Sequence, residues 1–198
     1  MGWKAVPLCP ARDLCCKVCL QDGGQSFTWE NVDECTWFNV IDGWCVVVRS
    51  ALDTVQLYIR EEDMPHAAQI ESAMRRYLRL DQDLAALYGR WMERDPKFPK
   101  QTQGVRLLRQ DPLETLLAFI CSQNNAIGRI KQLVTRLKRE FGCLQATQPF
   151  EGAILHFYQF PEGIEGLLGA EASLRAWKFG YRAKYLQGTA QRLQARSE

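Results

Sequence analysis

The amino-acid sequence predicts an α+β fold, because segments typical of strands come first and segments typical of helices follow. Between residues 14 and 60, short runs rich in valine, isoleucine and aromatic residues are separated by turn residues. Beyond Pro65, apolar residues recur at helical spacing. We therefore expect an N-terminal antiparallel sheet of about five strands with helices, followed by an all-helical part.

The expected sheet begins after an entry arm. Residues 1–12 contain two prolines that resist regular pairing. Residues 14–20 alternate between apolar and more polar positions, which predicts a strand with one buried face. Asp42-Gly43 predicts a tight hairpin, because such a turn needs positive φ. The other predicted strands are 25–30, 35–41, 44–50 and 54–60.

Helical patterns cover residues 70–78 and 84–91, and the proline-containing residues 96–103 are expected to be a connection. We accordingly divide the chain into residues 1–100 and 101–198. Gln148-Pro149 and Phe160-Pro161 are expected to interrupt the second part. Two further helices are predicted at 172–178, which Gly180 could end, and at 181–196.

A capped pair of helices dominates the second part. Asp111 at the N-cap, Pro112 at the first helical position and Glu114 three residues after the cap form a capping-box pattern. One apolar stripe follows, and a second ends near Gly142. Between the stripes lies a polar joint, residues 121–125.

Composition favours a soluble intracellular protein and leaves nucleic-acid binding open. The chain is 46% apolar and 24% charged, and no run approaches the length of a membrane-spanning helix. The net charge of +2 divides into −3 for residues 1–100 and +5 for the remainder. Residues 172–197 contain six basic residues and no acid, which fits either a solvated helix face or a phosphate-binding surface.

The eight cysteines are unevenly spaced in a chain large enough to form a core, so reduced thiols are expected. Cys16 and Cys19 have the spacing of half a zinc knuckle. No second such pair exists, and both histidines, His66 and His156, are distant. We therefore expect neither a metal site nor a cofactor.

The polar joint has two interpretations. Asn124 and Asn125 could simply cap a helix, because their amides satisfy backbone donors. Alternatively, Arg129 lies four residues after Asn125, on the same side of the helix, with Arg136 two turns further on. Amide and guanidinium groups on one exposed face would suit the edges of nucleic-acid bases.

Three peptides resemble those of one family. Residues 104–130, GVRLLRQDPLETLLAFICSQNNAIGRI, are similar to the signature segment of the eukaryotic 8-oxoguanine DNA glycosylases. Residues 24–29, GQSFTW, resemble the family's GQSFRW motif, with Thr28 in place of arginine, and residues 180–185, GYRAKY, resemble GYRARY. The resemblance implies a DNA glycosylase and AP lyase that repairs oxidised purines in the nucleus, with the mitochondrion as an additional location. Its implied partner is double-stranded DNA with 8-oxoguanine opposite cytosine, bound by a monomer away from any membrane.

The resemblance also implies roles for six residues. Gly24 would present its carbonyl to N7–H of the lesion, a donor that guanine lacks, and Asn125 would line the lesion pocket. Tyr181 would wedge into the duplex, while Asn124, Arg129 and Arg182 would bind the estranged cytosine. Without the resemblance, Gly24 is simply a turn residue, Tyr181 a surface or core residue and Arg182 a solvated charge.

The family's nucleophilic lysine and its aspartate partner follow a helix-hairpin-helix motif with a Gly-Val-Gly hairpin. This sequence contains no such hairpin, so we assign no catalytic residue and expect a partial family member with an incomplete helical glycosylase domain. Two alternatives remain open. The chain could be a non-catalytic or unstable product that binds damaged DNA, or an interaction module that never contacts DNA.

Overall fold

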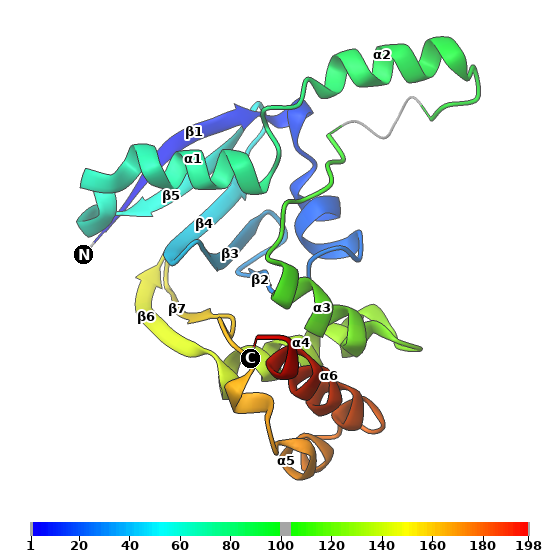
Figure 1. The fold of residues 1–198 in the computed structure, drawn as a ribbon. Coiled ribbons are helices and arrows are strands. Elements are labelled where there is room, and N and C mark those ends of the chain that lie inside the picture. The colour runs from blue at the N-terminus through cyan, green and yellow to red at the C-terminus, as the bar shows by residue number, and fades with distance from the viewer. Residues whose placement is uncertain (1, 100–103, 198) are drawn as a thin grey trace.

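The computed structural model describes residues 2–99 and 104–197. It confirms the α+β fold (Figure 1). An antiparallel sheet has the strand order β1-β5-β4-β3-β2. Its strands are β1 (Trp3–Pro10), β2 (Glu30–Asn31), β3 (Thr36–Ile41), β4 (Trp44–Ser50) and β5 (Thr54–Arg60). The expected connection at 96–103 lies partly outside the described residues, and the division into 1–100 and 101–198 stays a prediction.

The N-terminal expectations were wrong in two places. The proline-containing arm is strand β1, which can form because it lies at the sheet edge and carries an irregularity between Pro7 and Cys9. The expected strand at 14–20 is instead a short helix, Lys17–Asp22, after a turn at Ala11–Asp13. Buried Cys16, Cys19 and Leu20 lie on one face of this helix, so alternation over a short run did not distinguish strand from helix.

The central hairpin is confirmed. Asp42 and Gly43 connect β3 to β4 with φ of 49° and 80°, the left-handed values that a two-residue hairpin turn requires. The segment expected at 25–30 is extended, but only Glu30–Asn31 pairs with a neighbour, as β2. The remaining residues of that segment are held by side chains, as described below.

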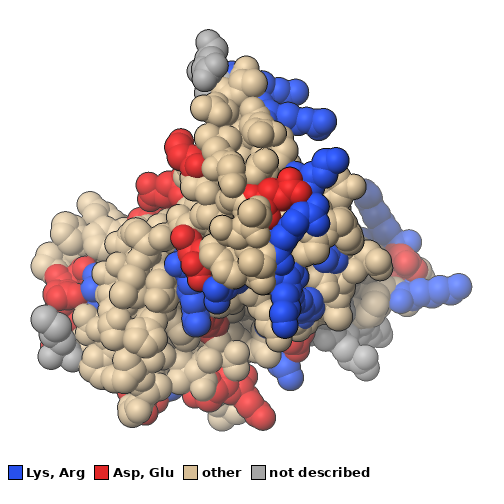
Figure 2. Space-filling model, turned by 90° about the horizontal axis from the view of Figure 1, so that it is seen from below, with Lys and Arg blue, Asp and Glu red and all other residues tan. Residues whose placement is uncertain are grey.

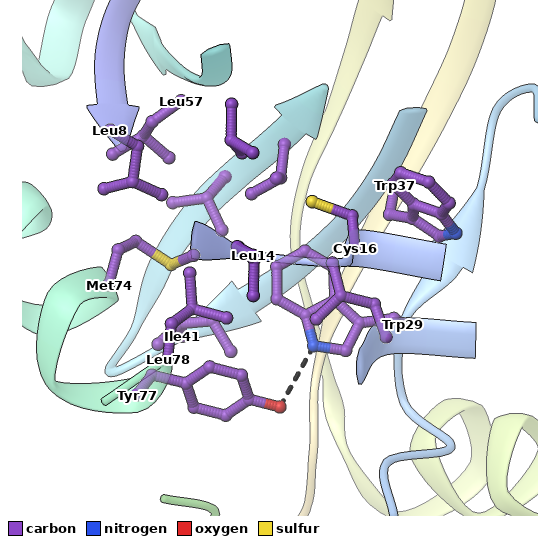
Figure 3. Close-up of a cluster of buried hydrophobic side chains, with 14 of the residues drawn as sticks. Leu8, Leu14, Cys16, Trp29, Trp37, Ile41, Leu57, Met74, Tyr77 and Leu78 are labelled. Carbon is purple, nitrogen blue, oxygen red and sulfur yellow. Dashed lines mark hydrogen bonds between the residues drawn. The ribbon is translucent and has the colours of Figure 1, made fainter. Parts of the chain in front are cut away.

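Helix α1 (Ala67–Tyr77) follows a 3-10 turn (Glu61–His66) and covers one face of the sheet. Met74 and Leu78 are fully buried against Leu8 and Leu57 in the cluster that Figure 3 shows. Helix α2 (Leu84–Arg94) projects from the body, with Asp83 accepting a hydrogen bond from the Ala86 backbone at its start (Figure 1).

The second part contains α3 (Pro112–Ser122), α4 (Ile127–Phe141), a 3-10 turn (Glu165–Leu167), α5 (Glu171–Ala176) and α6 (Arg182–Ser197). Asp111 caps α3 as predicted, since its carboxylate accepts from the Glu114 backbone N–H at 2.9 Å. The reciprocal half of the capping box is not formed. The Glu114 side chain accepts instead from the Thr28 hydroxyl at 2.9 Å.

The second part is not all-helical, contrary to expectation. Strands β6 (Cys143–Phe150) and β7 (Ala153–Gln159) form a hairpin whose turn, Glu151-Gly152, has positive φ at both residues. Pro149 was taken as a break, yet it pairs with Ile154 at the end of this two-stranded sheet. The hairpin buries apolar side chains against the face of the main sheet opposite α1, in a cluster of Phe38, Val40, Cys45, Val47, Phe150, Leu155 and Phe157.

Residues 2–99 and 104–197 contain neither a membrane-spanning helix nor a cluster of metal-binding side chains. No helix there is long and apolar enough to cross a membrane. Nor do three or more histidine, cysteine, aspartate or glutamate side chains gather there as a metal-binding set.

Candidate functional site

Gly24 starts the extended segment that leads to β2. Its φ is +68°, a value that favours glycine, and a Cβ built there would meet nothing within 4 Å. The requirement for glycine within this chain is therefore conformational. The open space beside Gly24 leaves its backbone accessible from outside.

The segment after Gly24 lies between two hydrophobic clusters. Phe27 is buried with residues of α3, α4 and α6, whereas Trp29 is buried with residues of the sheet and α1. The indole of Trp29 also donates to the Tyr77 hydroxyl at 3.0 Å (Figure 3). Both aromatic residues are thus core residues, and they fix the segment from opposite sides.

Side-chain amides provide the hydrogen bonds that a sheet partner would otherwise supply. The Gln25 amide donates to the Arg106 carbonyl at 2.8 Å and accepts from the Leu108 N–H at 3.0 Å. Gln110 donates to the Gln25 carbonyl at 2.7 Å. The backbone adjoining Gly24 is therefore anchored to the strand-like residues that enter α3.

The polar joint between α3 and α4 is a sharp turn. Asn124 has a φ of 46°, a left-handed conformation that asparagine tolerates, and its side chain is exposed. The Asn125 amide donates to the Cys121 carbonyl at 3.0 Å and accepts from the Ala126 N–H at 3.1 Å. Hydrogen bonds to the backbone of the joint thus account for the Asn125 side chain, whereas the Asn124 amide faces solvent.

The start of α6 contacts this joint. The Tyr181 hydroxyl donates to the Gln123 carbonyl at 3.0 Å. The Arg182 guanidinium donates to the carbonyls of Gln123 and Asn124, the latter at 3.1 Å, and lies 4.7 Å from the centre of the Tyr181 ring. Nε of Arg182 is buried and has no hydrogen-bond partner among the described residues. The protein itself therefore leaves part of this guanidinium unsatisfied.

Arg129 joins the same surface from α4. It donates to the Lys178 carbonyl and to the Gln132 side chain, both at 2.9 Å. Lys178 precedes the start of α6 and has a φ of 65°, which turns its carbonyl toward α4. Three segments, the joint, α4 and the α5–α6 turn, are thereby fastened together. Figure 2, seen from below, shows lysine and arginine side chains gathered near the centre of the face at this helical end.

The structure thus brings five of the six predicted residues together: Asn124, Asn125, Arg129, Tyr181 and Arg182. A Cβ built on Gly24 would meet none of them within 4 Å among the described residues. The Asp22 carboxylate, in the turn that contains Gly24, is near enough to Lys131 of α4 to act on it electrostatically.

Sequence reasoning missed Tyr185, which packs edge-on against Tyr181 with ring centres 5.9 Å apart and is 52% exposed. The spacing of four residues on a predicted helix was the available signal. Burial raises the pKa of the nearby Cys121 thiol to about 12, with the charge of Arg182 opposing the shift. Cys121 is therefore an inert core thiol.

A groove of about 650 Å³ lies beside this cluster, between α4, β2 and β7. Lys131, Gln132, Arg136 and Arg139 line it, but neither Gly24 nor Tyr181 does. Arg136 pairs with Glu140, and Arg139 pairs with Glu30. The cluster itself is a surface rather than a cavity. It combines an exposed amide, two guanidinium groups and a pair of exposed tyrosines, groups that can bind base edges and stack on bases.

Comparison with known proteins identifies the family. The model of the "8-oxoguanine DNA glycosylase, N-terminal domain" family matches residues 7–116, more than half of the chain. The chain belongs to the 8-oxoguanine DNA glycosylase family. A yeast "N-glycosylase/DNA lyase" is 34% identical over 203 residues, with 98% of this chain and 53% of the relative covered. The Arabidopsis thaliana "N-glycosylase/DNA lyase OGG1" is 33% identical, with 87% and 47% covered. This glycosylase-family chain thus spans about half the length of the curated relatives it matches.

Solved structures agree with the family fold. The 8-oxoguanine glycosylase/lyase of Clostridium acetobutylicum, in complex with double-stranded DNA containing cytosine opposite 8-oxoguanine, is 28% identical with a TM-score of 0.74, covering 94% of this chain and 61% of that one. MBOgg1 in complex with a low-affinity DNA ligand is 26% identical with a TM-score of 0.75, covering 100% and 68%.

Proposed function

We propose that this chain carries the base-reading surface of an 8-oxoguanine DNA N-glycosylase/AP lyase that acts in base excision repair. The single observation that carries the proposal is the junction of Asn124, Tyr181 and Arg182. It places a solvent-facing amide, a guanidinium and an exposed aromatic ring on one surface.

The proposed partner is double-stranded DNA with 8-oxoguanine opposite cytosine, flipped out of the stack for recognition. Tyr181, 45% exposed, would fill the space beside the extruded nucleotide. Asn124, Arg129 and Arg182 would meet the hydrogen-bonding groups of the abandoned cytosine. Both guanidinium groups would be held in place for this by the backbone carbonyls to which they donate.

Gly24 would read the lesion. Oxidation at C8 converts N7 of guanine from an acceptor into an N–H donor, so a fixed carbonyl attracts the lesion and repels the normal base. The anchoring of Gln25 and the burial of Phe27 and Trp29 support this role, because discrimination by one carbonyl requires a fixed backbone. Asn125 would contribute to the same pocket only by holding the joint.

Cleavage of the glycosidic bond is proposed for the whole family protein, and we assign no nucleophile within these residues. The second candidate function is therefore damage-specific DNA binding without catalysis. We also propose that the protein acts as a monomer. Its proposed location is the nucleus, and additionally the mitochondrion.

Equilibrium binding tests the function directly. Fluorescence anisotropy would compare labelled duplexes that differ only in carrying 8-oxoguanine or guanine opposite cytosine, over a series of salt concentrations. Tighter binding to the 8-oxoguanine duplex, with affinity falling as salt rises, supports the proposal. Equal affinity for both duplexes refutes lesion reading, and absence of any salt-dependent binding refutes DNA binding.

A further inference from the structure

A buried charged side chain lies behind the lesion-reading segment. Lys138 on α4 is 1% exposed, although lysine is almost never fully buried without a partner. Its side chain points inward, between α3, α4, β3 and residues 26–30. The proposed DNA-binding cluster uses none of its atoms, and at this exposure the ammonium cannot contact DNA.

The Lys138 ammonium has two short hydrogen bonds. It donates to the Thr28 carbonyl at 3.0 Å and to Oδ1 of Asn39 at 2.8 Å. Its third neighbour is the Glu30 carboxylate at 3.8 Å. Two of these three partners, Thr28 and Glu30, belong to the segment that begins at Gly24. The ammonium therefore ties α4 to the backbone of that segment.

Thr28 is bonded on its hydroxyl side as well. The hydroxyl donates to the Glu114 carboxylate at 2.9 Å and accepts from the Asn39 amide at 3.0 Å. Thr28 is itself 2% exposed. The carbonyl and the hydroxyl of Thr28 are thus both used by a network of Lys138, Asn39 and Glu114, which Ser26 joins at 3.5 Å.

The sequence departs from its family motif at this same residue. GQSFTW carries Thr28 where GQSFRW carries an arginine, so the segment has lost a positive charge. The Thr28 hydroxyl lies 2.9 Å from Glu114, so a longer cationic side chain at residue 28 would emerge beside the same carboxylate. In this chain the positive charge near Glu114 comes from α4 instead.

We propose that Lys138 is a positioning residue for lesion recognition, and that it supplies from α4 the buried positive charge that an arginine at residue 28 would supply from the segment itself. This inference rests on the proposed function. Without the ammonium, the Thr28 carbonyl and the Asn39 oxygen lose their donor and the Glu114 carboxylate loses its compensating charge. The backbone four residues from Gly24 is then released, and the lesion-reading carbonyl is less well fixed.

A charge-exchange cycle tests the proposal. The four proteins are the unmodified chain, Lys138→Met, Thr28→Arg and the double variant, with Lys4→Met, an exposed lysine on edge strand β1, as the matched control. For each, the affinities for 8-oxoguanine·cytosine and guanine·cytosine duplexes and the thermal unfolding midpoint are measured. We expect Lys138→Met to lower the ratio of the two affinities about tenfold while leaving affinity for the unmodified duplex unchanged.

Thr28→Arg alone places two cations together and lowers the unfolding midpoint. The double variant regains both the midpoint and the affinity ratio, and Lys4→Met changes neither. If Lys138→Met alone does not fold, recovery in the double variant still supports the proposal. The proposal is overturned if Lys138→Met leaves the ratio of the two affinities unchanged. It is also overturned if the double variant has an affinity ratio and an unfolding midpoint no higher than the summed effects of the single variants predict. If the unmodified chain does not discriminate between the duplexes, the proposed function fails, whereas the unfolding midpoints still decide the charge exchange.

Discussion

The Tyr181 hydroxyl donates a hydrogen bond to the Gln123 carbonyl at 3.0 Å, although the two residues are 58 positions apart in the sequence. This contact fixes the start of α6 on the turn between α3 and α4. It orients an exposed ring, which would otherwise rotate freely, beside the guanidinium of Arg182. The arrangement of the proposed base-reading surface therefore depends on backbone carbonyls at a helix–helix joint.

Two substitutions of Tyr181 distinguish the contribution of its hydroxyl hydrogen bond from that of its aromatic ring. Tyr181→Phe removes one partly exposed hydrogen bond and should lower the free energy of unfolding by about 1 kcal/mol, as measured by urea denaturation. Tyr181→Ala should in addition weaken binding to the 8-oxoguanine duplex, because the wedge is lost. Equal affinities for the phenylalanine and alanine variants would contradict the wedge role.

Arg182→Gln should remove preference for the base opposite the lesion. A well-placed arginine contact contributes about 1–3 kcal/mol of discrimination between bases. We therefore expect the variant to bind 8-oxoguanine duplexes with cytosine or adenine opposite the lesion with similar affinity, whereas the unmodified chain prefers cytosine. Arg12→Gln, at an exposed position in the turn after β1, is the control. An unchanged preference in Arg182→Gln would exclude contact with the opposite base.

Gly24→Ala should affect recognition more than stability. The new methyl group would meet no atom within 4 Å, but φ of +68° is unfavourable for alanine, so unfolding should become easier by about 1 kcal/mol. Close approach of a base to the carbonyl would be obstructed, and the preference for 8-oxoguanine over guanine should be lost. Gly43→Ala has a similar φ of 80° in the β3–β4 turn and controls for backbone strain. A retained preference in Gly24→Ala would remove Gly24 from the site.

Stability should depend on the protonation of Glu114. Burial raises the pKa of this carboxyl to about 6 from its usual 4.5, while the Thr28 hydrogen bond and the charge of Lys138 oppose the shift. The folded protein therefore binds this proton more tightly than the unfolded chain, and the corresponding stability is lost as pH rises from about 4.5 to about 6. The loss is about 2 kcal/mol. Glu114→Gln should flatten the pH dependence of unfolding in that window, and an unchanged slope would exclude Glu114 as its source.

Local patterns predicted the parts of the fold that local chemistry determines. Asp42-Gly43 specified a turn, and Asp111 specified a helix start, because each depends on its immediate neighbours. Strands β1 and β6 were missed since each contains proline, which is tolerated only because of where the strand lies in its sheet. Residues 17–22 were misassigned because a short run of alternating residues is compatible with either element.

The members of the proposed site stay a prediction, and only the structure shows the contacts between them. The family resemblance indicated Asn124, Arg129, Tyr181 and Arg182 from their side chains. The structure connects them through the carbonyls of Gln123, Asn124 and Lys178, which any residue type could supply, so the sequence gives no signal for these contacts. The hydrogen-bond network of Lys138 could not be predicted from the sequence, for a different reason. A lysine on a basic helix predicts a solvated charge, and only tertiary packing buries it.

Hydrogen–deuterium exchange on the unmodified chain, with and without an 8-oxoguanine·cytosine duplex, tests the central claim most directly. The account predicts slower exchange in peptides covering residues 23–29, 122–130 and 178–186 when the duplex is bound, with residues 3–10 and 67–77 unchanged. Protection confined to other surfaces, with the start of α6 and the α3–α4 joint exchanging as in the free protein, would contradict it.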